Sequence, residues 1–209
     1  MIDETSFLEE VVDAFSKIAS AHDDELNKLA GQIDRSLIPH EDEYWCELQY
    51  RSHTTDEVQQ ILARSLIMTV GMTIESELNK LSTYLQRRHK EKIPPRDYKN
   101  GRGMKTRVDY INVLSGKELL KQDSDFDLLV ELRNIIAHDN GWVSAKKIES
   151  LKLRYGSSNL LPEFRNGRIF IHQQLLPKFV EVAKRIMTAT HNYWECEKNL
   201  VFAEPMPEN

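Results

Sequence analysis

Residues 61–74 read ILARSLIMTVGMTI, the longest apolar run in this chain of 209 residues. In an α-helix of 3.6 residues per turn the run is apolar on nearly every side, which is typical of a central helix surrounded by others. It contains Arg64 and is shorter than the roughly 20 residues that a membrane-spanning helix needs. The run therefore predicts the central helix of a helical protein that has no membrane span.

Helical spacing extends from this run in both directions. Apolar residues recur at intervals of three and four from Val58 to Leu85, and a proline pair at 94–95 ends the pattern. Because Thr54 and Glu57 fit a capping box, we expect this helix to begin at Thr54.

Residues 1–53 are predicted to form an N-terminal helix and an acidic connector. Ser6 and Glu9 fit a second capping box, and Pro39 stops a helix that approaches it. The stretch from Ile38 to His53 is polar and rich in acidic residues, as a connector would be. The apolar stripe of the N-terminal helix consists of Leu8, Val11, Phe15, Ile18, Leu26, Leu29 and Ile33.

Three more helices are expected downstream. They are predicted around 108–120, from about 125 to 138, and over 176–194, where apolar residues return at helical spacing. Asp123 or Ser124 is a suitable N-cap for the second of these helices.

One β-hairpin interrupts this helical pattern. Residues 160–164 and 168–171 flank Asn166-Gly167, the dipeptide that a tight hairpin turn prefers. Only eight glycines and seven prolines occur, which favours helices over turn-rich β architecture.

The sequence therefore predicts an all-α fold. We expect a bundle of about five main helices, with one small β-hairpin near 160–171. Residues 1–209 would form a single helical domain whose core covers 54–199.

Net charge and its distribution bear on nucleic-acid binding. The net charge of −5 and the pI of about 5.8 argue against a general nucleic-acid binder. Basic residues nevertheless gather in one stretch that is the first candidate for contact with a phosphate backbone, although such a run is more often a solvated loop. Its members are Arg87, Arg88, Lys90, Lys92, Arg96, Lys99, Arg102, Lys105 and Arg107.

Cysteine usage and the N-terminus indicate a cytoplasmic protein. Cys46 and Cys196 lie far apart, without metal-ligand spacing, and each is next to a tryptophan or within two residues of one. We expect both to be buried, reduced thiols. No basic region followed by an apolar run is visible at the N-terminus, so no export signal is expected.

The stretch that bears on chemistry is ELRNIIAHDNG at residues 131–141. At 100° per residue its apolar side chains, with Leu128 and Leu129, fall within one arc, which we expect to face the core. Arg133, Asn134 and His138 fall on the opposite arc around the small Ala137, and Asp139-Asn140-Gly141 is a strong helix stop. The small Ala137 at the centre of this outer face would let a second helix approach closely.

Arginine, asparagine and histidine together suit phosphodiester cleavage. Histidine exchanges a proton near neutral pH, arginine binds phosphate through a fixed fork of donors, and asparagine can orient either. No carboxylate pair, HExxH sequence or histidine–cysteine cluster offers a metal site, so no metal and no cofactor are expected. A purely structural interpretation competes, because cationic side chains and asparagine also favour helix C-termini.

The string Arg133-Asn134-Ile135-Ile136-Ala137-His138 resembles the R-x4-6-H motif of the HEPN (higher eukaryotes and prokaryotes nucleotide-binding) superfamily. The resemblance extends over 54–199 in architecture, but only these six residues are specific. It implies a metal-independent endoribonuclease in which two motifs meet across a homodimer. Arg133 would stabilise phosphate charge, His138 would act as acid or base, and Asn134 would position the reacting groups.

The resemblance also implies RNA as a partner, and a role in antiphage defence, a toxin–antitoxin pair or a stress response, with an antitoxin or nucleotidyltransferase as a further partner. Two alternatives stay open. One is a non-catalytic HEPN-like module that binds a nucleotide or a protein through the same residues, and the other is a helical scaffold without a ligand. The N-terminal helix, the acidic connector and the hairpin lie outside the minimal family pattern.

Overall fold

The computed structural model describes residues 41–91, 93–95, 97–100 and 103–203, together with eleven residues between Glu9 and Lys28. Those eleven residues are helical, as the N-terminal pattern predicts, while Pro39 and Ser6 of the N-terminal capping box lie outside the described residues. The described chain is mostly helical, with one two-stranded antiparallel sheet, so the predicted all-α fold with a small hairpin is confirmed. Its elements are α2 (Glu41–Arg88), α3 (Met104–Ser115), α4 (Ser124–Asp139), α5 (Ala145–Tyr155), β1 (Glu163–Arg165), β2 (Arg168–Phe170) and α6 (Leu176–Ala203), with short 3-10 turns at Tyr98–Asn100 and Gln173–Leu175.

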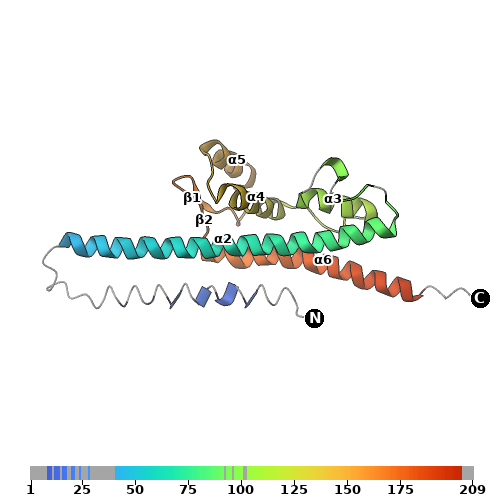
Figure 1. The fold of residues 1–209 in the computed structure, drawn as a ribbon, viewed down its shortest axis with the longest axis horizontal. Helices are drawn as coiled ribbons and strands as arrows, with labels where there is room; N and C mark the ends of the chain where they lie inside the picture. The colour runs from blue at the N-terminus through green and yellow to red at the C-terminus, as the bar shows by residue number, and fades with distance from the viewer. Residues whose placement is uncertain are drawn as a thin grey trace, which may run out of the picture.

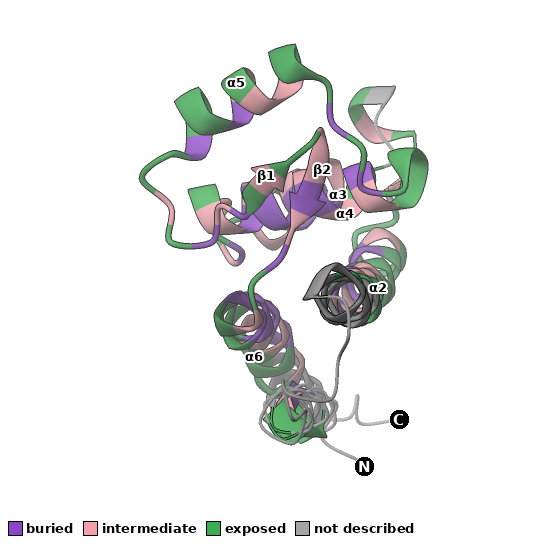
Figure 2. Ribbon diagram, turned by 90° about the vertical axis from the view of Figure 1, so that its left-hand side faces the viewer, coloured by how far each residue is buried: buried purple, intermediate pink, exposed green. Residues whose placement is uncertain are grey.

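Two long helices, α2 and α6, form the base of the molecule and run in the same direction (Figure 1). In the first half of α2, the Gln60 side chain exchanges two hydrogen bonds with the backbone of Ile171, five residues before α6, at 2.7 and 2.9 Å. Near the ends of both helices, the rings of Tyr84 and Trp194 lie 4.4 Å apart. Helices α3 and α4 cover one side of this pair, and α5 and the hairpin lie beyond α4 (Figures 1 and 2).

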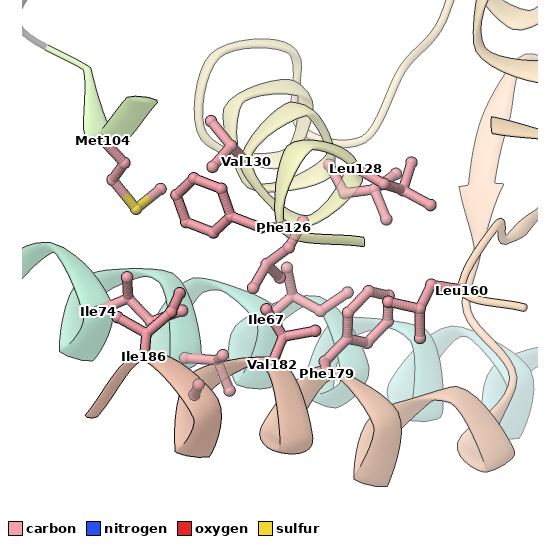
Figure 3. Close-up of a cluster of buried hydrophobic side chains, with 14 of the residues drawn as sticks. Ile67, Ile74, Met104, Phe126, Leu128, Val130, Leu160, Phe179, Val182 and Ile186 are labelled. Atoms are coloured by element: carbon pink, nitrogen blue, oxygen red, sulfur yellow. The ribbon is translucent and has the colours of Figure 1, made fainter. Parts of the chain in front are cut away.

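The core fills the space between α2, α4 and α6. Figure 3 shows Ile67 and Ile74 of α2 opposite Phe179, Val182 and Ile186 of α6, with side chains of α4 closing the cluster from above. Burial of these apolar side chains supplies the main driving force that holds the three helices together.

The central run of α2 is buried on one side only. Ala63, Leu66, Ile67, Val70 and Ile74 are buried, as predicted. The expectation that helices surround the run is wrong, because no described element covers its other face, where Met72 is 60% exposed. The exposed positions of this face between 58 and 72 carry no charge, and we call it the α2 apolar face: Val58, Ile61, Leu62, Ser65, Thr69 and Met72.

Two boundaries of the predicted helices are wrong. Helix α2 begins at Glu41 and not at Thr54, since no glycine or proline interrupts residues 41–53 and a capping-box sequence can also lie inside a helix. The predicted connector is therefore helical from Glu41 onward. Helix α3 covers Met104–Ser115 and not 108–120, because Gly116 adopts the left-handed conformation (φ 69°) that ends a helix.

Helix α5 was not anticipated from the sequence. Ser144 caps it by accepting a hydrogen bond from the Lys147 amide at 3.3 Å, and Leu151 and Tyr155 are buried one turn apart. This cap and an apolar stripe at Ile148, Leu151 and Tyr155 were present in the sequence, so the helix could have been predicted.

The local signals around α4 and the hairpin are confirmed. The Asp123 carboxylate accepts a hydrogen bond from the Phe126 amide at 2.9 Å and caps α4. Asn140 ends α4 in the left-handed conformation at φ 51°. Asn166 and Gly167 both have positive φ in the turn between β1 and β2, as their sequence predicts.

Both cysteines are exposed, so the prediction of buried thiols is wrong. Cys46 lies near the beginning of α2 and Cys196 near the end of α6, where these helices extend past the packed core (Figure 1). Among the helices that the structure describes, none combines the length and apolar character needed to cross a membrane.

Candidate functional site

Helix α4 positions the three residues of the candidate motif. Its Leu128, Leu129, Leu132 and Ile135 side chains are buried and fix the rotation of the helix about its axis. Asn134, Ala137 and His138 are exposed on the other side, so the predicted division into a core face and an outer face is confirmed for them.

Arg133 lies between the two faces and not on the outer one. Its stem packs against Gly71 of α2, where an added Cβ would lie 2.8 Å from the arginine Cγ. One guanidinium nitrogen, Nη2, donates to Glu75 Oε2 at 2.8 Å, and Nη1 donates to Asn134 Oδ1 at 3.1 Å. The guanidinium is thus anchored to α2 and also points one donor group toward the outer face of α4.

Glu75 binds a second arginine at the same time. Its other oxygen, Oε1, accepts a hydrogen bond from Arg107 Nη1 of α3 at 2.9 Å. The side chains of Arg107, Arg133 and Glu75 are 13%, 21% and 27% exposed, so this triad, here called the Glu75 clamp, is largely removed from water. It joins α2, α3 and α4, and it leaves one excess positive charge next to the motif.

His138 lies in the last turn of α4 with its ring in solvent. No hydrogen bond or ion pair to another described residue engages this ring. On a helix, positions 133 and 138 are about 140° apart, so the two side chains flank Ala137 and leave it in different directions. One copy of the chain therefore presents Asn134, Ala137 and His138 as an open surface, with Arg133 at its edge.

The predicted basic stretch lies apart from His138. Lys92, Arg96 and Arg102 are outside the described residues, while Arg87, Arg88 and Lys90 are exposed around the end of α2. Three other members are held in ion pairs within the chain: Lys99 with Asp109, Lys105 with Asp127, and Arg107 with Glu75. Arg64 contacts the end of α4 and precedes Arg87 by 23 positions (87 − 64), which is about 35 Å along a helix. Of the described members, only Arg107 comes close to the motif, through Glu75.

A cluster not anticipated from the sequence surrounds the end of α4. Arg64 Nη1 donates to the Asn140 carbonyl at 3.3 Å, and Trp142 forms a β-bridge with Arg168 of β2. The Arg168 guanidinium lies over the indole, 4.6 Å from the ring centre. The available signals were an arginine inside an apolar run and a tryptophan directly after a helix stop. Nothing local links either of them to Arg168.

A surface pocket of about 410 Å³ lies beside this cluster. Ile135 and Asp139 of α4 line it, together with Trp142 and the residues that begin α5. A larger hollow of about 630 Å³ lies against α6 near the beginning of α4, at the other end of that helix from His138. Of the two, we assign the smaller pocket to the candidate site because Asp139, the residue after His138, lines it.

Among the residues that the structure describes, no three histidine, cysteine, aspartate or glutamate side chains converge as metal ligands would. Comparison of the chain with protein-family models, curated proteins and solved structures finds no match.

Proposed function

We propose that this protein is an endoribonuclease of HEPN type that cleaves RNA without a metal ion. The observation that carries the proposal is the exposed imidazole of His138, which has no partner among the described residues, on the same open helix face as Asn134, whose Oδ1 accepts a hydrogen bond from Arg133 Nη1. Histidine and arginine in this arrangement can exchange a proton and bind a phosphate.

The proposed reaction is transesterification by the RNA itself. His138 accepts the proton of a 2′-hydroxyl, whose oxygen attacks the adjacent phosphorus, and the bond to the 5′-oxygen breaks. A protonated second histidine supplies the proton that the leaving oxygen takes up. The products are a 2′,3′-cyclic phosphate and a 5′-hydroxyl, and Arg133 stabilises the negative charge that develops on the phosphate oxygens.

A second copy of the chain completes the proposed site. Within one copy His138 and Arg133 diverge, and no second histidine lies on the outer face of α4. Gly71, on which Arg133 packs, is buried and lies about 100° around the helix from Met72, so α4 and the α2 apolar face lie on adjacent sides of α2. Burial of that face against a second copy would remove apolar surface from water and bring two α4 helices together over Ala137.

One observation favours a second candidate function, a non-catalytic module. The Glu75 clamp already neutralises Arg133 and fixes its stem, as a purely structural arginine would be held. In that case α4 and the α2 apolar face serve dimerisation or ligand binding only. The defence, toxin–antitoxin and stress-response roles stay predictions under either function.

The test is cleavage of a mixed RNA pool in excess chelator by the wild-type chain and by His138→Ala. His191→Ala is the matched control, since His191 is an exposed histidine on α6. All three proteins are compared at equal dimer content, measured by light scattering. We expect cyclic-phosphate ends from the wild type and His191→Ala, and loss of at least about 100-fold of the rate in His138→Ala, the size of a general acid–base contribution.

Equal rates in all three proteins would show that a contaminating nuclease is responsible. No cleavage by a wild type that dimerises and binds RNA would leave the non-catalytic module as the function.

A further inference from the structure

We propose that Arg64, Trp142 and Arg168 form a binding site for one nucleotide unit of single-stranded RNA. The two guanidinium groups would hold a phosphate, and the indole would stack on a base. The choice of RNA rests on the proposed function, and the site would hold the strand next to His138.

Gly141 brings the three side chains together. An added Cβ on this residue would lie 3.2 Å from Arg64 Nη1, so the Arg64 side chain packs directly on its backbone. Its carbonyl accepts a hydrogen bond from the Ile169 amide at 2.9 Å, which places Arg168 and Trp142 opposite each other in the β-bridge. The end of α4, the strand β2 and the helix α2 therefore converge on one residue.

Arg64 and Arg168 are neighbouring like charges without a bound carboxylate. Neither forms an ion pair with a described residue. Burial lowers the pKa of Arg64, the positive charge of Arg168 lowers it further, and Glu57 raises it by a smaller amount. A phosphate between the two guanidinium groups would remove their repulsion and accept their hydrogen bonds.

Both guanidinium groups retain donors for a ligand. Arg64 uses Nε for the Gln60 carbonyl at 3.0 Å and Nη1 for Asn140, which leaves the greater part of its five N–H groups free among the described residues. The Nε of Arg168 is buried without a hydrogen-bond partner in the described structure. The two Nη groups of Arg168 form no hydrogen bond with a described residue, so they remain available to an acceptor.

Trp142 supplies the surface for a base. Its side chain is 52% exposed, while Arg168 covers part of the ring and Gly167 packs against its edge. The exposed part borders the pocket of about 410 Å³. A half-exposed indole beside arginines is the combination that single-stranded nucleic acids use for stacking and phosphate contact.

The position along the chain connects this site to the motif. The Trp142 amide donates to the Asp139 carbonyl at 2.9 Å, which holds the tryptophan against the last turn of α4, where His138 lies. A nucleotide stacked on Trp142 would thus occupy a position next to the bond that His138 acts on.

Structural roles explain only part of this cluster. Arg64 stabilises the C-terminus of α4 through the Asn140 carbonyl, and Arg168 gains from its position over the indole. Neither role requires a second guanidinium next to the first or a tryptophan that remains half in solvent.

The experiment is fluorescence anisotropy with a short labelled single-stranded RNA, in the His138→Ala chain so that the strand is not cut. In that chain we expect Arg64→Gln with Arg168→Gln to weaken binding about 10-fold or more. The slope of log affinity against log salt should fall by about 0.7 for each phosphate that the protein no longer neutralises. Trp142→Leu should weaken binding about 5-fold or more, and Trp142→Phe should restore most of it, because phenylalanine still stacks.

Arg165→Gln is the matched control, since Arg165 lies on the same hairpin but is paired with Glu163 at 2.8 Å. It should bind as the parent does. Circular dichroism and thermal melting check that each variant folds. If the double arginine variant does not fold, the comparison of Trp142→Leu with Trp142→Phe still tests the site.

Unchanged affinity in the folded Trp142→Leu and arginine variants would overturn the site. Competition by adenosine monophosphate as strong as by the strand, at equal nucleotide concentration, would overturn its assignment to a strand. RNA binding that depends on these residues, without chelator-resistant cleavage by the wild type, would retain the site and remove the ribonuclease. Chelator-resistant cleavage by the wild type that is unchanged when any of these residues is substituted would retain the ribonuclease and remove the site.

Discussion

Two pairs of arginines lie along the same side of α2, and their charges are balanced differently. Arg107 and Arg133 share the carboxylate of Glu75, with N–O distances of 2.9 and 2.8 Å. Arg64 and Arg168, about three turns toward the beginning of α2, have no carboxylate between them in the described part of the chain. The first pair joins three helices and has its counter-ion built into the chain. The second pair concentrates positive charge around Trp142, which lines an open pocket, and a site for an anionic ligand requires such a concentration.

Glu75→Gln should have the largest effect on stability. It leaves two mostly buried guanidinium groups without a counter-ion, and we expect a loss of about 2 kcal/mol in the free energy of unfolding, less than a fully buried pair because each group keeps some contact with water. Urea denaturation measures it. Glu181→Gln on α6 is the control, because the Glu181 side chain is 70% exposed and its pair with Lys184 is a surface pair. Equal effects of the two substitutions would show that the Glu75 clamp is not a structural clamp.

Gly141→Ala should have the next largest effect, at the other arginine pair. Gly141 has φ 81°, and its new Cβ would meet Arg64 at 3.2 Å. The left-handed conformation costs an ordinary residue about 1–2 kcal/mol, and displacement of Arg64 should also weaken RNA binding. Thermal unfolding and the anisotropy measurement report the two effects separately.

Gly103→Ala is the control for Gly141→Ala. Gly103 has φ −82° and open space around it, so its substitution should be the milder one and leave RNA affinity unchanged. A loss of RNA affinity as large as that of Gly141→Ala would mean that the affinity loss does not report on Arg64.

Features that depend on neighbouring residues could be predicted from the sequence, whereas the two arginine pairs could not. The ends of α4 and the hairpin turn were predictable because Asp123, Asn140 and Asn166-Gly167 act on their own neighbours. The start of α2 was not, since a capping box is only one use of its residues and the helix can continue through it. The rotation of α4 followed from its period, so the exposure of Asn134 and His138 was predictable too.

The partners of the arginines could not be predicted in the same way. Glu75 lies 58 positions before Arg133, and Arg168 lies 104 positions after Arg64 (168 − 64). Both relations arise only when α4 packs on α2 and the hairpin closes over the end of α4. Local spacing carries no information on such long-range pairs, and charge counts treat all four arginines alike.

Arg64→Gln should change stability less than Arg133→Gln does. Removal of Arg64 loses a hydrogen bond to the Gln60 carbonyl in its own helix and a long one to the Asn140 carbonyl, but it also relieves repulsion with Arg168, so we expect a change within about 0.5 kcal/mol. Arg133→Gln breaks the bond to Glu75 and should cost about 1–2 kcal/mol. Urea denaturation of both variants gives the contrast, and a larger loss in Arg64→Gln would make that arginine a structural residue.

Gly71→Ala should change stability least, because two effects of similar size oppose each other. Alanine in place of glycine stabilises a helix interior by about 1 kcal/mol, whereas the new Cβ, 2.8 Å from Arg133 Cγ, pushes that side chain away from Glu75. A double-mutant cycle with Glu75→Gln separates the two effects: if Gly71 is what lets Arg133 reach Glu75, the loss caused by Glu75→Gln should shrink in the Gly71→Ala chain. Strict additivity would mean that Arg133 reaches Glu75 by another path. The small size of Gly71 would then serve the approach of α4 and not the placement of its arginine.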